Sequence, residues 1–117
     1  TKTTVFLDKD EFLQSVKLSS VFAKENANIV KLKVAKGSLS LSARSQGLGE
    51  GETKIEVEQN GEDNEISFNA KFLTDFLRSV SSKKITLNIN SSIEPGLFKQ
   101  ENDESYLHVI MPVRVQE

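Results

Sequence analysis

The chain has 117 residues, of which 37% are hydrophobic and 27% charged, and its formal net charge at pH 7 is −2. These values are typical of one globular domain that buries its own core. A generic nucleic-acid-binding domain would be basic, so the slightly acidic balance argues against that class. The sequence holds no cysteine, which excludes disulfides and cysteine-based zinc sites. No apolar run approaches the roughly 20 residues of a membrane-spanning helix.

Alternation of apolar and polar residues indicates that most of the chain forms β-strands. Segment 29–35 is the clearest case, because its apolar residues share one face and its lysines share the other. Gly37 supplies a turn into a returning strand at 38–43. Asn60-Gly61 predicts a hairpin that leads into the next strand, around residues 66–68. The other predicted strands are 3–7, 54–58, 85–89 and the C-terminal segment.

Two stretches follow a helical period instead. Asp8 is a good N-cap with Glu11 three residues later, and the helix that begins there is predicted to end near Phe22. Asn69 is a second N-cap candidate. It precedes a dense apolar stripe at helical spacing, formed by Phe72, Leu73, Phe76, Leu77 and Val80.

The predicted order of elements is β-α-β-β-β, repeated once. Each half begins with a strand, an Asx N-cap and a helix that needs one face buried. We therefore predict an α+β fold in which two helices pack on one face of antiparallel sheets.

Four segments carry a family resemblance, and they occur in the family's order. They are Phe68–Leu73, Leu39–Ser45 followed by Gly49–Glu52, Ser91–Gly96, and Val109–Arg114. Together they resemble the C-terminal domain of the bacterial sliding clamps, the DNA polymerase III beta subunits, over nearly the whole chain. One departure is Phe72, where the family more often has tyrosine.

The resemblance implies a non-catalytic processivity factor. In that family three such domains form a subunit, and two subunits close a ring around duplex DNA. Residues 1–117 would be the third domain of a longer subunit, in keeping with a start at Thr1 rather than methionine. The implied partners are duplex DNA, the DNA polymerase III alpha subunit, the clamp loader and repair polymerases. The resemblance implies a cytoplasmic, nucleoid-associated protein that needs no cofactor or metal and has no membrane partner.

The resemblance also implies a cleft that receives short peptides in which glutamine precedes apolar and aromatic residues. Met111 can adapt to different apolar side chains, Pro112 removes a backbone donor, and Arg114 offers directional donors. The alternative is that 109–111 are plain strand core and Asn69 is only an N-cap. The candidate cleft residues are Asn69, Phe72, Ile93, Pro95, Val109, Ile110, Met111, Pro112, Val113, Arg114 and Val115.

Two further surfaces follow from the resemblance. Lys17, Lys71 and Arg78 would face DNA, where lysine and arginine give sequence-independent attraction; the alternative is an ordinary solvated helix face. The subunit interface would need an apolar centre with charged flanks, whereas an apolar pair near a helix end is commonly just core. The candidate interface residues are Val21, Phe22, Glu50 and Glu52, and of the apolar pair Phe22 is preferred.

Nothing in the sequence indicates a catalytic centre. His108 is the single histidine and lies in a predicted strand, where a structural or solvent-facing role is expected rather than that of a general base. The acidic run 8–11 is better explained by helix capping than by Ca²⁺ binding. The glycine-rich run 47–51 lacks the Lys-Ser/Thr of a phosphate loop. The competing hypotheses are a stand-alone α+β adaptor with no DNA role and, with little support, an enzyme that uses aspartate and serine groups.

Overall fold

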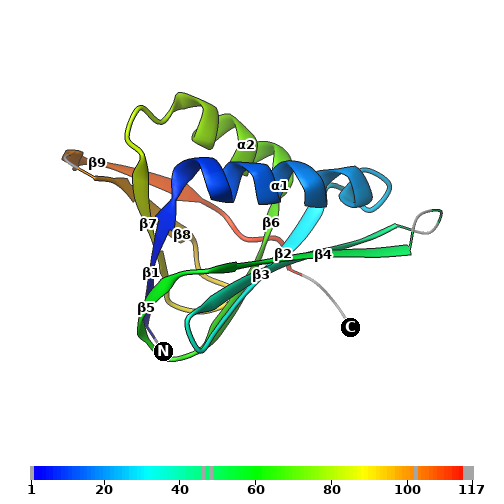
Figure 1. Ribbon diagram of the computed structural model, residues 1–117, viewed down its shortest axis with the longest axis horizontal. Helices are drawn as coiled ribbons and strands as arrows, with labels where there is room; N and C mark the ends of the chain where they lie inside the picture. The colour runs from blue at the N-terminus through cyan, green and yellow to red at the C-terminus, as the bar shows by residue number, and fades with distance from the viewer. Residues whose placement is uncertain (1, 46, 48, 102, 115–117) are drawn as a thin grey trace.

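The computed structural model describes residues 2–45, 47, 49–101 and 103–114, and the side chains of all of these except 103–106 (Figure 1). Within these residues it has two helices, α1 (Lys9–Ala23) and α2 (Ala70–Ser79). The strands are β1 (Thr3–Asp8), β2 (Ile29–Ala35), β3 (Ser38–Ser45), β4 (Gly49–Glu56), β5 (Glu58–Gly61), β6 (Asn64–Asn69), β7 (Lys84–Ile89), β8 (Gly96–Gln100) and β9 (Asp103–Ile110). No helix among the described residues is long and apolar enough to cross a membrane.

The structure has two antiparallel sheets, and each contains strands from both halves of the chain. The first has the order β5-β1-β7-β8-β9, and the second has the order β4-β3-β2-β6. The first strand of each half therefore belongs to the sheet formed by the other half: β1 pairs with β7, and β6 pairs with β2. The repeated β-α-β-β-β order and the α+β class are confirmed. The second half is completed by β8, which is not among the predicted strand ranges, and β5 is one additional short strand.

The predicted Asn60-Gly61 hairpin is wrong. β5 pairs with β1 in the five-stranded sheet, with Thr3 opposite Gly61, whereas β6 pairs with β2 in the other sheet. The Asn-Gly signal is local, and long-range pairing of β5 with β1 overrides it. The chain instead leaves β4 at Val57 and crosses from one sheet to the other. Gly61 keeps a positive φ of 99°, and a Cβ there would collide with the backbone of Lys2.

Both predicted helix starts are confirmed. The Glu11 amide donates to Asp8 Oδ1 at 3.0 Å, and the Lys71 amide donates to Asn69 Oδ1 at 2.9 Å. Each bond satisfies one of the free N–H groups of a first helical turn. The two helices pack against each other and lie on the same side of the molecule (Figure 1).

The core is a single cluster between the helix layer and the sheets. Phe98 of β8 lies at its centre on the α2 side, with its ring centroid 5.0 Å from Phe76 and 5.9 Å from Phe68. Such tilted aromatic pairs add about 0.5–1.5 kcal/mol each beyond the burial of their area. The predicted apolar stripe of α2 is buried except for Phe72, which is 55% exposed. The start of α2 thus presents an aromatic ring to the surface.

Candidate functional site

The chain's last described segment returns to the start of α2. After β9 ends at Ile110, the Val113 amide donates to the Ser67 carbonyl oxygen of β6 at 2.8 Å. Pro112 has no amide to offer, so it cannot extend this pairing. The arrangement resembles the crossing of β4 into β5, because in each half the last strand continues onto the edge of the other sheet. It places Met111–Val113 beside the strand that leads into Asn69 and Phe72.

A pocket of about 420 Å³ opens between α2 and β9. Four of the predicted cleft residues line it, namely Phe72, Val109, Ile110 and Met111. The structure adds four lining residues that the sequence did not suggest: Asp75, Phe76, Ser79 and His108. Positions 72, 75, 76 and 79 share one face of α2, so their helical spacing could have indicated that Asp75, Phe76 and Ser79 lie on the same side as Phe72.

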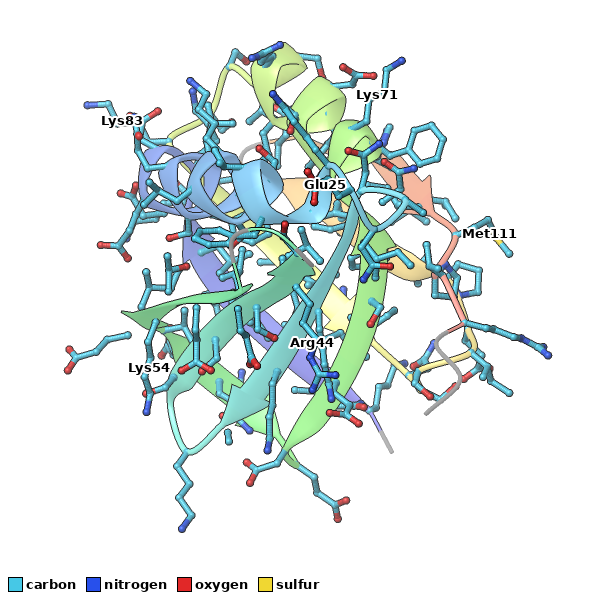
Figure 2. The ribbon with its side chains drawn as sticks, turned by 90° about the vertical axis from the view of Figure 1, so that its right-hand side faces the viewer. Glu25, Arg44, Lys54, Lys71, Lys83 and Met111 are labelled. Carbon is cyan, nitrogen blue, oxygen red and sulfur yellow. The ribbon has the colours of Figure 1, made fainter. Side chains whose placement is uncertain are left out.

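The floor of this pocket is buried and its walls are exposed. Phe76 and Ile110 are 3% and 4% exposed, whereas Met111 is 65% exposed and projects from the end of β9 (Figure 2). The His108 ring stacks on Phe76, and burial lowers its pKa from the ordinary value of 6.5. Exposed apolar walls around an apolar floor suit the capture of apolar side chains from a ligand.

The remaining predicted cleft residues that the structure describes are not among those that line this pocket. Gly96 pairs with Ile110, so the preceding Pro95 lies at the Met111 end of β9. Ile93 is exposed in the same loop. The side-chain oxygen of Asn69 accepts the capping hydrogen bond from the Lys71 amide at the start of α2. Pro112, Val113 and Arg114 follow the pocket along the chain. Val115 lies outside the described residues.

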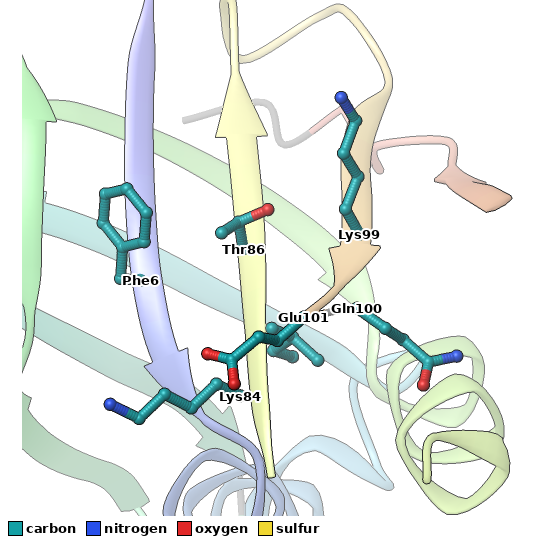
Figure 3. A pocket seen from close by; sticks show the side chains of 7 residues that line it. Phe6, Lys84, Thr86, Lys99, Gln100 and Glu101 are labelled. Atoms are coloured by element: carbon teal, nitrogen blue, oxygen red, sulfur yellow. The ribbon is translucent and has the colours of Figure 1, made fainter. Parts of the chain in front are cut away.

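A larger pocket, of about 660 Å³, lies on the outer face of the five-stranded sheet. Figure 3 shows Phe6, Thr86 and Lys99 side by side across β1, β7 and β8, in agreement with the strand register. Its other lining residues are Lys84, Ile85, Gln100 and Glu101. Phe6 offers the exposed apolar surface here, and the strongly hydrated lysines make this pocket a poorer receptor for apolar side chains.

The predicted DNA-facing residues share the solvent side of the helix layer. Lys17 lies on α1, and Lys71 and Arg78 lie on α2; all three are exposed. Within the described residues, none of the three forms an ion pair with Asp or Glu. Their charges are therefore available to an anionic partner.

The predicted interface residues lie at the C-terminal end of α1 and on β4. The Phe22 ring is partly buried and lies against Gly51, where a Cβ would collide with it. Glu50 and Glu52 are exposed on either side of Gly51 in β4, the edge strand of its sheet. Val21 is 52% exposed, so Val21 rather than Phe22 offers the larger free apolar surface. An unpaired edge with an apolar side chain beside it can pair with another chain.

The described residues hold no group of three or more His, Asp or Glu side chains that could bind a metal. The arrangement offers instead an apolar pocket at the chain end, a basic helix face and an open sheet edge.

Comparison with known proteins identifies the family. The family model described as the DNA polymerase III beta subunit, C-terminal domain, matches residues 1–114. The beta sliding clamps of Chlamydia pneumoniae and Bacillus subtilis are 33% and 32% identical to the chain, over 100% and 97% of its length. The solved DNA polymerase III beta subunit of Thermotoga maritima has a TM-score of 0.93 at 30% identity, over 97% of this chain and 31% of that one.

The chain spans about a third of the curated relatives it matches, 32% and 31% of their lengths. The match nevertheless runs through both helices, both sheets and the residues of the pocket between α2 and β9. The chain therefore belongs to the DNA polymerase III beta subunit family, the beta sliding clamps, and corresponds to their C-terminal domain.

Proposed function

We propose that the chain acts as the third domain of a sliding-clamp subunit and that its pocket between α2 and β9 binds peptide segments of replication proteins. The observation that carries this proposal is the pocket itself, where exposed Phe72 and Met111 surround a buried apolar floor. Met111 is flexible and polarisable, so one pocket can accept different apolar side chains. The role is tethering, and the residues perform no chemistry on the peptide.

The remaining cleft residues extend the pocket into a groove. Ile93 and Pro95 would contact the peptide at the Met111 end, and Arg114 would donate to its backbone or to acidic side chains. Asn69 would serve as the α2 N-cap and also offer its side-chain NH₂ group. The Val113 amide holds this wall against β6 through its bond to the Ser67 carbonyl oxygen; Pro112 would contribute apolar surface beside it, and Val115 would extend the wall.

The helix layer would face duplex DNA inside a closed ring. Lys17, Lys71 and Arg78 would attract phosphates without reading sequence, which suits a ring that must slide. The chain alone is slightly acidic, so we expect this attraction to be weak outside the ring.

The ring would close through β4. Val21 and Phe22 would form the apolar centre of a contact with a second subunit, and Glu50 and Glu52 would flank it. A homodimer of longer subunits would encircle DNA. Through their pockets these subunits would tether the DNA polymerase III alpha subunit, the clamp loader and repair polymerases, in the cytoplasm beside the nucleoid.

Titration of the isotope-labelled chain with a Gln-Leu-Ser-Leu-Phe peptide tests the proposal by NMR. We expect the amide shifts of Phe72 and Met111 to move with weak affinity, because neighbouring domains would complete the groove. A peptide with both leucines and the phenylalanine changed to alanine is the control. The proposal would be abandoned if both peptides left these shifts unchanged at millimolar concentration.

A further inference from the structure

The α2 rim of the pocket is formed by groups that accept hydrogen bonds. Asp75 and Ser79 lie four residues apart on α2, so their side chains share one helix face, and both line the pocket. The carboxylate of Asp75 accepts hydrogen bonds and carries a negative charge. The Ser79 hydroxyl donates a hydrogen bond to the Phe76 carbonyl oxygen at 2.7 Å. The Ser79 oxygen can therefore still accept a hydrogen bond from a ligand.

Among the residues that the structure describes, no cationic side chain pairs with Asp75. This holds although Lys71 and Arg78 lie on the same helix. Among the described residues that line the pocket, His108 is the other ionisable one. Burial lowers the pKa of His108 from its ordinary value of 6.5, which favours the neutral ring over the imidazolium.

The rest of the pocket suits a long aliphatic stem. Phe76 and Ile110 form an apolar floor, and Phe72 and Met111 are exposed beside it. Lysine and arginine bury their methylene groups on such surfaces and keep the charged head at the edge. The exposed ring of Phe72 also favours a nearby cation.

We propose that the pocket between α2 and β9 selects peptides that carry a basic side chain, arginine foremost, next to their apolar motif. The arginine stem lies on Phe72 and Met111, and its guanidinium group donates to the Asp75 carboxylate and the Ser79 oxygen. Arginine fits better than lysine because its planar fork can donate to both acceptors. This inference rests on the proposed function, and Asp75 is the residue that sets the preference.

The test compares arginine with citrulline, its neutral isostere. Fluorescein-labelled peptides carry Gln-Leu-Ser-Leu-Phe with either residue directly before the glutamine or directly after the phenylalanine. Their affinities are measured by anisotropy for the parent chain, for Asp75→Asn and for Glu58→Gln. The last variant removes a carboxylate from β5, at the opposite edge of the sheet that contains β9.

In one of the two peptide positions, we expect arginine to bind the parent chain and Glu58→Gln about two- to fivefold more tightly than citrulline, as an exposed ion pair allows. The preference should vanish in Asp75→Asn and shrink as salt is added. Equal binding of arginine and citrulline peptides to the parent chain, or a preference that survives in Asp75→Asn, overturns the inference and leaves the peptide-binding function standing. Failure of every peptide to bind overturns both.

Discussion

The imidazole ring of His108 stacks on the phenyl ring of Phe76, with centroids 4.4 Å apart and planes inclined by 18°. The pair joins β9 to α2 at the inner end of the pocket, and Phe76 continues the contact to Phe98 in the core. The floor of the pocket is therefore part of the hydrophobic core. Changes that loosen this pair should alter both the stability of the fold and the shape of the pocket.

The stability of the domain should fall on acidification in a way that depends on His108. Because burial lowers the pKa of His108 below its ordinary value of 6.5, the unfolded chain binds a proton more readily than the folded chain. Stability from this group is complete above pH 6.5 and is lost as the pH falls through the folded-state pKa. Urea unfolding at pH 7.5 and pH 5 measures this loss. The variant His108→Gln lacks the histidine and keeps only the part of the loss that comes from protonation of carboxylates, so its stability should fall less than that of the parent chain. An equal loss would contradict the prediction.

Phe72 should matter for peptide binding far more than for stability. Its ring is 55% exposed, so Phe72→Ala should change the free energy of unfolding by less than about 0.5 kcal/mol. The same change should weaken binding of the Gln-Leu-Ser-Leu-Phe peptide severalfold, since an exposed wall of the pocket is lost. Leu18→Ala on α1 is a matched control, because Leu18 is 58% exposed and does not line the pocket. Equal weakening by both changes would point to a general effect and away from the pocket.

Asn69 allows its capping and binding roles to be separated. Asn69→Ala removes the acceptor for the Lys71 amide and should cost about 1 kcal/mol of stability. Asn69→Ser keeps a capping oxygen but loses the NH₂ group, so stability should be retained while peptide affinity falls. Thermal unfolding and anisotropy measure the two effects. If Asn69→Ser bound peptide as well as the parent chain, Asn69 would be an N-cap and nothing more.

Gly96 should tolerate no side chain. A Cβ at this position would collide with the ring of Phe68 and lie 3.3 Å from Leu87 Cδ1, both of which are buried. Overpacking of this kind costs about 1–3 kcal/mol, and Gly96→Ala should therefore lower the midpoint of urea unfolding. Gly47→Ala is the control, because its Cβ would make only an ordinary contact, 3.7 Å from Glu25. A stable Gly96→Ala variant would mean that Phe68 can move freely, contrary to the packing described above.

Much of the fold could be predicted because its signals are local. Alternation in 29–35 fixes which residues face the core, and Asp8 and Asn69 each supply an oxygen at the point where a helix begins. The course of β5 could not be predicted, since pairing of Gly61 with Thr3 depends on a partner far away in the sequence. A local Asn-Gly pattern carries no information about that partner.

The site was only partly predictable for a similar reason. The motif at 109–111 identified one wall of the pocket, and Phe72 identified the other. No sequence signal singled out Asp75 or Ser79, and Phe76 belongs to the apolar stripe predicted for α2. The tertiary contact between Phe76 and His108 brings this face of α2 against β9. The contact joins residues 32 positions apart, and no local period reveals it.

The most direct test of the central claim locates a bound peptide on the surface of the domain. Intermolecular nuclear Overhauser effects are measured between the isotope-labelled chain and an unlabelled Gln-Leu-Ser-Leu-Phe peptide. We predict contacts from the peptide's leucine methyl and phenylalanine ring protons to the ring of Phe72 and the methyl group of Met111. Contacts to Phe6 and Thr86 on the outer sheet face instead, with none to Phe72 or Met111, would contradict the account.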